Sequence, residues 1–225
     1  MLPVSCEILS DFTTPIEAMR ILKQVSTHCY MLESAASHET WGRYTFLGFD
    51  PSLEITCRNG EMRAGCLHFP TADPSAYLRQ VLEEHKSPRF DHLPPFTGGL
   101  VGYFSYDYLG YSEPSVRAEV EDSEEFRDLD LMLFDKVIAY DHLKQKIQIV
   151  VNMKTGRTER GICEELERCE GRKRCEGREN GNTSGGLEYL MKEYKRACEE
   201  IQEMASLISD TAPLKRLSSP EKPSL

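Results

Sequence analysis

Apolar residues near the start of the chain recur with two different periods. Residues 16–25 carry apolar side chains at helical spacing behind Thr14 and Pro15, which predicts a capped first helix. Residues 28–35 and 43–58 are instead short runs rich in Tyr, Thr, Phe and Ile, a composition typical of strands. A helix followed by two or three strands is therefore expected here.

Two hairpins are predicted from turn-forming residues between apolar runs. Asn59-Gly60 is a type I′ turn signal, so residues 53–58 should pair antiparallel with residues 61–67. The polar segment 141–146 joins two further β-rich runs, residues 129–142 and 144–153. Antiparallel pairing thus dominates the predicted strands.

Two later segments have the pattern of amphipathic helices. Thr71 or Asp73 can cap a helix that begins near Pro74 and ends before Pro88, with one apolar face. Residues 187–209 carry a continuous stripe of apolar residues three and four positions apart. We expect the second of these helices to be long.

Glycines precede a run of aromatic residues in the middle of the chain. Such glycines suggest close backbone packing within a strand. The residues concerned are Gly98, Gly99 and Gly102, followed by Phe104, Tyr106 and Tyr108.

These patterns predict an α+β fold with a largely antiparallel β-sheet flanked by helices. We expect four regions along the chain. A β-rich domain covers residues 1–156, a charged Gly/Asn-rich flexible insertion follows at 157–186, the long helix occupies 187–209, and a Pro/Ser-rich, linker-like tail ends the sequence at 210–225.

Charge and hydrophobicity exclude several classes of protein. The chain has 27 basic and 37 acidic residues, a net charge of −10 that would repel phosphate backbones, so no nucleic-acid partner is expected. No apolar run approaches the roughly 20 residues of a membrane span, and Glu7 and Asp11 interrupt the place of a secretory signal, which predicts a cytoplasmic protein without membrane association. Residues 113–135 hold nine acids and two arginines, and this excess predicts a solvated loop.

The sequence contains none of the common catalytic signatures. A phosphate-binding loop, a GxSxG elbow, an HExxH motif and an EF-hand loop are all missing, and the six histidines are isolated. The eight cysteines include no CxxC pair, which favours reduced thiols, and the six-residue spacing of Cys163, Cys169 and Cys175 is not that of a metal site. We therefore expect neither a catalytic residue nor a metal ligand in this chain.

Glu33 is the most informative polar residue, because it interrupts an apolar run suited to a buried strand. A buried carboxylate would need an arginine or a ligand amine as its partner, and Ser34 adds a further hydrogen-bonding group. Alternatively, Glu33 points outward from a half-exposed strand. The chemistry of the residue leaves both interpretations open.

Four sequence blocks stand out by their order and spacing. They are Met-Leu-Glu-Ser at 31–34, residues 42–48 with Pro51, residues 96–107, and residues 130–135 with the strand at 147–153. Together they resemble the N-terminal domain of anthranilate synthase component I, and the resemblance covers about residues 5–209. The related aminodeoxychorismate synthase component I shares two of these regions, but the sequences of residues 103–108 and 111–114 are more similar to anthranilate synthase.

This resemblance implies a part in making anthranilate and pyruvate from chorismate and glutamine-derived ammonia, the first step of tryptophan biosynthesis. In that family the C-terminal half binds chorismate and Mg²⁺, a glutamine amidotransferase subunit supplies ammonia, and tryptophan inhibits from a site in the β-sandwich. Carried over by position, Leu32, Glu33 and Ser34 contact the effector L-tryptophan, and Arg43 stands near a basic residue of some members. Met31 replaces the usual first leucine of the motif.

The resemblance also implies that this chain holds a regulatory and structural portion without the catalytic half. Alone it should be inactive, need no cofactor, and expose apolar surface or an unpaired sheet edge that its chorismate-binding half would cover. Three alternatives remain: the corresponding portion of aminodeoxychorismate synthase component I, a stand-alone amino-acid-binding module, and an inactive remnant.

Overall fold

The computed structural model describes residues 1–33, 42–113, 115, 126–156 and 183–209, which form two five-stranded antiparallel sheets with helices against them. The first sheet has the order β1-β10-β9-β3-β2 and the second β6-β5-β4-β8-β7. The strands are β1 (Leu2–Leu9), β2 (Cys29–Glu33), β3 (Tyr44–Phe49), β4 (Leu53–Arg58), β5 (Glu61–Ala64), β6 (Leu67–Pro70), β7 (Gly99–Phe104), β8 (Leu129–Phe134), β9 (Lys136–Asp141) and β10 (Lys146–Met153). The helices are α1 (Pro15–Val25), α2 (Pro74–Glu84), the 3₁₀ turn η1 (Tyr106–Tyr108), α3 (Leu109–Ser112) and α5 (Thr183–Ser209). The predicted α+β class with antiparallel sheets is confirmed.

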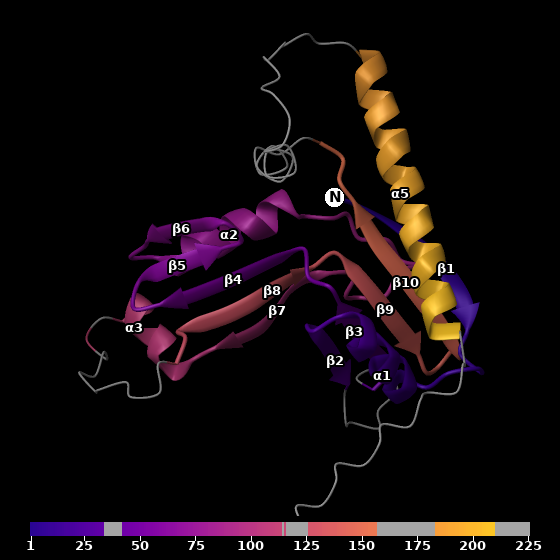
Figure 1. The fold of residues 1–225 in the computed structure, drawn as a ribbon, viewed down its shortest axis with the longest axis horizontal. Helices are drawn as coiled ribbons and strands as arrows, with labels where there is room; N and C mark the ends of the chain where they lie inside the picture. The colour runs from indigo at the N-terminus through magenta and orange to yellow at the C-terminus, as the bar shows by residue number, and fades with distance from the viewer. Residues whose placement is uncertain (34–41, 114, 116–125, 157–182, 210–225) are drawn as a thin grey trace, which may run out of the picture.

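The first sheet buries one face under α1 and α5 (Figure 1). Leu22 of α1 and Ile201 and Ile208 of α5 pack on Leu47, Ile138 and Ile149 of the strands, and nearly all of these side chains are fully buried. The apolar stripe of α5 explains this position, since only one side of that helix can be buried against a sheet. The helix begins at Thr183, earlier than predicted, and includes Gly185 and Gly186, which were assigned to the insertion.

The second sheet has its own core beneath α2. Leu78 and Val81 of the helix pack on Ile55, Met62 and Leu131. Asp73 caps this helix through its side chain, which accepts a hydrogen bond from the Ala76 amide. The helix ends at Glu84, so its predicted extent and cap are confirmed.

The two sheets meet where the chain passes directly from β8 to β9 (Figure 1). Only Asp135 lies between these strands, and the Asn152 side chain donates a 3.2 Å hydrogen bond to its carbonyl oxygen. The predicted β-rich run over residues 129–142 is confirmed, and it forms two strands, one in each sheet. The predicted turn that follows it does join β9 to β10.

The first hairpin has the predicted turn and a shorter second strand. Asn59 and Gly60 have φ values of 50° and 79°, the positive pair that a type I′ turn requires. Strand β5 ends at Ala64, however, and the chain reverses again at Gly65 before β6 begins. The predicted single strand over residues 61–67 is thus two strands.

Two further predictions needed correction. Residues 106–108 form η1 and do not extend the aromatic strand, which ends at Phe104. Asp128 is only 8% exposed and accepts hydrogen bonds from the Asn59 amide and the Tyr111 hydroxyl, so this acid does not belong to a solvated loop. The assigned insertion over 157–182 and the tail over 210–225 lie outside the described residues, and the domain boundaries remain predictions.

Candidate functional site

The candidate effector residues lie at the end of β2, which is an edge strand of the first sheet. Leu32 is 44% exposed and Glu33 is also exposed. Of the two interpretations of Glu33, the outward-facing one is correct for this structure. Ser34 falls outside the described residues.

Thr45 lies directly across from Glu33 on β3. Directly opposed side chains in an antiparallel pair stand on the same face, about 5 Å apart at Cβ. The Thr45 side chain is fully buried, and its hydroxyl shares a 2.7 Å hydrogen bond with Nε2 of His142. The surroundings of Glu33 therefore include a hydroxyl and an imidazole that the sequence did not single out.

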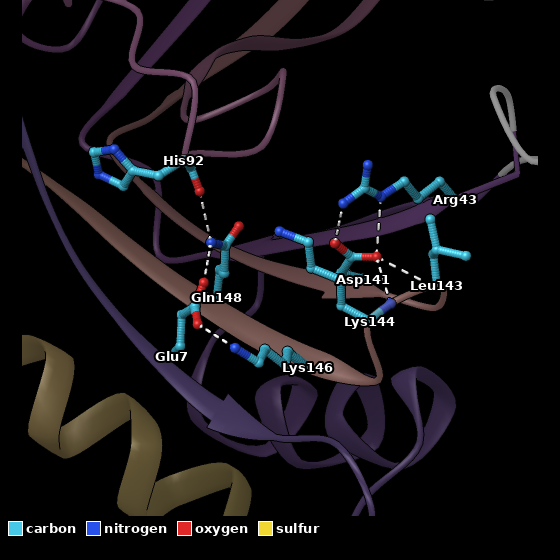
Figure 2. A network of polar contacts seen from close by, with 8 residues as sticks. All are labelled: Glu7, Arg43, His92, Asp141, Leu143, Lys144, Lys146 and Gln148. Atoms are coloured by element: carbon cyan, nitrogen blue, oxygen red, sulfur yellow. Dashed lines mark hydrogen bonds and ion pairs between the residues drawn. The ribbon is translucent and has the colours of Figure 1, made fainter.

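Arg43 is already paired within the protein (Figure 2). Its Nε and Nη2 donate hydrogen bonds of 3.0 and 2.6 Å to the two carboxylate oxygens of Asp141, a two-point contact that positions the guanidinium. Its guanidinium carbon also lies 4.8 Å from the centroid of the Tyr44 ring. The predicted effector role of Arg43 is not tested by this contact, but its charge is matched internally.

Asp141 also organises the turn between β9 and β10. One of its carboxylate oxygens accepts hydrogen bonds from the Leu143 and Lys144 amides, at 3.1 and 3.0 Å (Figure 2). Burial acts to raise the pKa of Asp141, but the hydrogen bonds from Arg43 and from these amides outweigh it and hold the pKa below its ordinary value. Asp141 is therefore a carboxylate at neutral pH.

An aromatic cluster lies on the opposite face of the first sheet. Tyr30 contacts Phe96 and Phe134 edge-on at centroid distances of 6.3 and 4.7 Å, and Phe46 contacts the same Phe96 at 5.6 Å. Gly48 lies beneath the Tyr30 ring, where an added Cβ would come within 2.1 Å of Cε1. Leu32, two residues from Tyr30 on the same strand, belongs to this face.

A second polar network in Figure 2 ties β1 to β10 and to the segment before β7. Gln148, which is buried, donates to a Glu7 carboxylate oxygen at 2.8 Å and to the His92 carbonyl oxygen at 2.9 Å. Lys146 pairs with the other Glu7 oxygen at 2.7 Å. These contacts are structural, because every group in them has a partner from the chain itself.

Among the described residues, no three His, Cys, Asp or Glu side chains lie close enough together to hold a metal ion. Cys163, Cys169 and Cys175 fall outside this part of the chain. No helix in the described ranges combines the length and the apolar character needed to cross a membrane.

Comparison with known families identifies the chain. The model of the chorismate binding enzyme family matches residues 27–206, which include β2, Arg43 and most of both sheets. The chain belongs to this family. The resemblance seen in the sequence blocks is thereby confirmed, and Leu32, Glu33 and Arg43 all lie inside the matched region.

Curated members of the chorismate binding enzyme family include close relatives named anthranilate synthase component 1. The protein from Acetivibrio thermocellus is 33% identical over 175 residues, covering 75% of this chain and 35% of the relative. That from Aquifex aeolicus is 36% identical over 172 residues, covering 75% and 34%. A crystal structure of anthranilate synthase component I from Streptococcus pneumoniae aligns at 27% identity with a TM-score of 0.45, covering 72% and 35%. The chain thus spans about a third of the length of these curated relatives.

The structure places three residues near the candidate site that the sequence did not indicate. Asp141, Thr45 and His142 approach the region of Glu33 and Arg43 only through pairing of β3 with β2 and β9. The sequence separation of Arg43 and Asp141 is 98 residues. In the sequence, Asp141 is recognisable only as a charged residue at the end of a predicted strand, and this position does not indicate that Arg43 is its partner.

Proposed function

We propose that this chain is the N-terminal regulatory and structural portion of an anthranilate synthase component I, acting in the conversion of chorismate and ammonia to anthranilate and pyruvate. The match to relatives of that name over three quarters of the chain carries the proposal. Glutamine-derived ammonia would come from an amidotransferase subunit in the cytoplasm.

We infer that free L-tryptophan is the effector and that Leu32, Glu33 and Ser34 contact it. Support comes from the exposed carboxylate at the end of β2, which can form a charge-assisted hydrogen bond with a ligand ammonium. Leu32, the preceding residue, offers exposed apolar surface on the opposite face of the same edge strand. Arg43, held at the start of β3 by Asp141, is the further residue that we assign to this site.

A chorismate-binding half is the expected partner of this portion. Strands β2 and β7 are sheet edges, where further strands can pair. Exposed aromatic side chains lie at the end of β7 and just after it, among them Phe104 at 51% and Tyr106 at 82%. Such surface favours a partner that covers it.

Complementation with a catalytic half tests the proposal. The chain is co-expressed with the C-terminal half of a related enzyme, and anthranilate fluorescence is followed with chorismate, Mg²⁺ and ammonia. We expect activity that neither part has alone, and inhibition by added L-tryptophan. Activity from this chain alone, or no association of the two parts, would contradict the proposed division. Formation of aminodeoxychorismate in place of anthranilate would assign the chain to the related enzyme.

The effector site is tested in the same complemented enzyme. Glu33→Gln should raise the L-tryptophan concentration for half-inhibition by about tenfold or more, the effect of losing a charge-assisted hydrogen bond. Activity without tryptophan should not change. Glu54→Gln is the matched control, because Glu54 is also an exposed strand carboxylate but lies on β4. Equal effects of the two substitutions would refute the assignment.

A further inference from the structure

Two further polar residues stand in one row with the candidate effector carboxylate. Glu33 ends β2, Thr45 lies opposite it on β3, and His142 directly follows β9. The Asp50 amide donates to the His28 carbonyl oxygen at 3.2 Å, and hydrogen-bonded pairs of β2 and β3 alternate from that pair onward. By this alternation Glu33 and Thr45 form a non-hydrogen-bonded pair, the kind in which opposed side chains come closest.

The Thr45 hydroxyl fixes the orientation of the His142 ring. Thr45 is fully buried, and its Oγ1 shares a 2.7 Å hydrogen bond with Nε2 of His142. The His142 backbone is held as well, because its amide donates to the Arg43 carbonyl oxygen at 2.9 Å. Since Nε2 is directed at Thr45, the second ring nitrogen, Nδ1, points away from it.

Both ends of this row carry a polar group that the protein leaves open. The Glu33 carboxylate forms no ion pair or hydrogen bond within the part of the chain that the structure describes, and Nδ1 of His142 forms none there either. Glu33 and His142 are both exposed, so a ligand can reach them. The hydroxyl between them is used by His142 and is buried.

The charges along the row differ in sign between its ends. At the His142 end, the carboxylate of Asp141 is occupied by the Arg43 guanidinium and by two backbone amides, which leaves the positive charge of nearby Lys144 unbalanced by it. At the other end stands the unpaired carboxylate of Glu33. A ligand that lies along the row is therefore favoured if it is positive toward Glu33 and negative toward His142.

The length of the row suits an α-amino acid. Strands β2 and β9 both neighbour β3, so Glu33 and His142 are two strand spacings apart, about 10 Å at the backbone. An ammonium and a carboxylate on one carbon, with a hydrogen bond of about 2.8 Å at each end, span most of that distance, and the two side chains cover the rest. An amine without a carboxylate would satisfy only the Glu33 end.

Building on the proposed L-tryptophan site at the end of β2, we propose that His142 recognises the α-carboxylate of the effector while Glu33 holds its ammonium. Thr45 is a positioning residue. When its hydroxyl donates to Nε2, the neutral ring carries its proton on Nδ1, and the ligand carboxylate accepts a hydrogen bond there. The site then distinguishes amino acids from amines.

Inhibition of the complemented enzyme by L-tryptophan and by tryptamine, which lacks the carboxylate, tests this role of His142. With the natural chain, tryptamine should be weaker by about tenfold or more, because it loses a charge-assisted hydrogen bond. His142→Ala should raise the half-inhibitory concentration of L-tryptophan by about tenfold and leave that of tryptamine unchanged. Glu33→Gln should weaken both ligands, since both carry the ammonium. Equal effects of His142→Ala on the two ligands, or no effect on either, would overturn the assignment.

A second substitution and a control separate recognition from a general disturbance of the sheet. Thr45→Val keeps the shape of the buried side chain but removes the hydroxyl, and it should weaken L-tryptophan by about threefold or more without changing tryptamine. His28→Ala is the matched control, because His28 is an exposed histidine at the start of β2 that pairs with Glu54 at 3.4 Å. It should change neither ligand. Circular dichroism verifies that each variant is folded.

The effector site and the role of His142 can fail separately. If L-tryptophan does not inhibit the complemented enzyme made with the natural chain, the effector site is refuted and the role of His142 with it. If L-tryptophan inhibits and Glu33→Gln weakens that inhibition while His142→Ala does not, only the role of His142 is refuted.

Discussion

At the scale of single residues, Asp141 determines how the start of β3 is held. It is 4% exposed, and its two oxygens accept from the Arg43 guanidinium and from two backbone amides of the following turn. A buried carboxylate is tolerated only when its hydrogen-bonding capacity is used in this way. The contact therefore couples the sheet next to Glu33 to the turn between β9 and β10.

Asp141→Asn should lower the free energy of unfolding by about 1–3 kcal/mol, because Arg43 loses its charged partner while staying partly buried. Urea denaturation measures the change. Glu83→Gln, which removes the exposed pair with Lys86, should cost less than about 0.5 kcal/mol. Similar losses in the two variants would show that the Asp141 pair is no more important than a surface pair.

The same carboxylate predicts a pH dependence. Its pKa is lower in the folded chain than in the unfolded chain, where an aspartate titrates at about 3.9. Its contribution to stability is then complete above the unfolded pKa and is lost as the pH falls through the lower, folded pKa. The stability difference between the natural chain and Asp141→Asn should therefore shrink between pH 5 and strongly acidic pH, in urea titrations at about one-unit steps. A difference that grows in acid would be inconsistent with the lowered pKa.

Gly102 of β7 lies against the neighbouring strand. A Cβ at this position would lie 2.0 Å from the carbonyl oxygen of Asp130, far inside contact distance, and the backbone would have to move. Gly102→Ala should destabilise the chain by about 2 kcal/mol or more, as overpacking does in well-packed regions. Gly156→Ala, where nothing lies within 4 Å, should have little effect on the thermal midpoint. Two equal midpoints would disprove the close approach.

At the scale of elements, the N-terminus of helix α1 is determined by hydrogen bonds between neighbouring residues. Thr14 accepts a hydrogen bond from the Glu17 amide, and the Glu17 carboxylate accepts one from the Thr14 amide, so both ends of a capping box are present. Pro15 occupies the first turn, where it needs no amide donor. The sequence predicted this start correctly because all participants lie within four consecutive residues.

Thr14→Ala should cost about 1 kcal/mol of unfolding free energy, since it leaves a helix amide without its acceptor. Thr14→Ser keeps the hydroxyl and should cost much less. Guanidinium denaturation of the two variants makes the comparison, and a loss in the serine variant as large as in alanine would rule out the cap as the cause.

The division of residues 129–141 shows the opposite case at this scale. The run is rich in apolar, strand-forming residues along its whole length, so its pattern does not show where it divides, yet Leu131 is buried beneath α2 and Ile138 beneath α1 and α5. Which helix covers each of the two strands depends on segments that are distant in the sequence.

Asp135, the single residue between the two strands, is partly buried, and that burial raises its pKa.

At the scale of the whole molecule, the exposed edge strand β7 is the feature that we expect to control self-association. Phe104, Tyr106 and Phe126 are 51%, 82% and 55% exposed near an edge strand, a combination that promotes association. The isolated chain should therefore form dimers or larger species at concentrations of about 10 to 100 μM, in the range of weak contacts.

Phe104→Lys should shift that equilibrium toward monomer in sedimentation velocity, because a charge on an edge strand opposes pairing. Leu143→Lys is the control: Leu143 is 63% exposed but follows Asp141 in a turn. Equal shifts would mean that general charge repulsion, and not the β7 edge, controls association. Coexpression with a catalytic half should suppress self-association of the natural chain if both use the same edge.

The sequence by itself determined the helices α1, α2 and most of α5, the turn at Asn59-Gly60, and the close packing at Gly98 and Gly102. These features follow from interactions within a few residues, such as caps, apolar spacing and permitted φ values. The position of Leu32 and Glu33 on a strand was predictable for the same reason.

The tertiary structure decided the remainder. Sheet pairing joins segments that are far apart in the sequence. It brings Arg43 to Asp141 over 98 residues, Thr45 to His142 over 97, and Thr97 to Asn152 over 55. The division between β8 and β9 depends on the same pairing. Hydrophobic patterning specifies which face of a strand is buried, but it does not specify which strand or helix covers that face. That choice depends on the summed packing of the whole chain, which no short stretch of sequence contains.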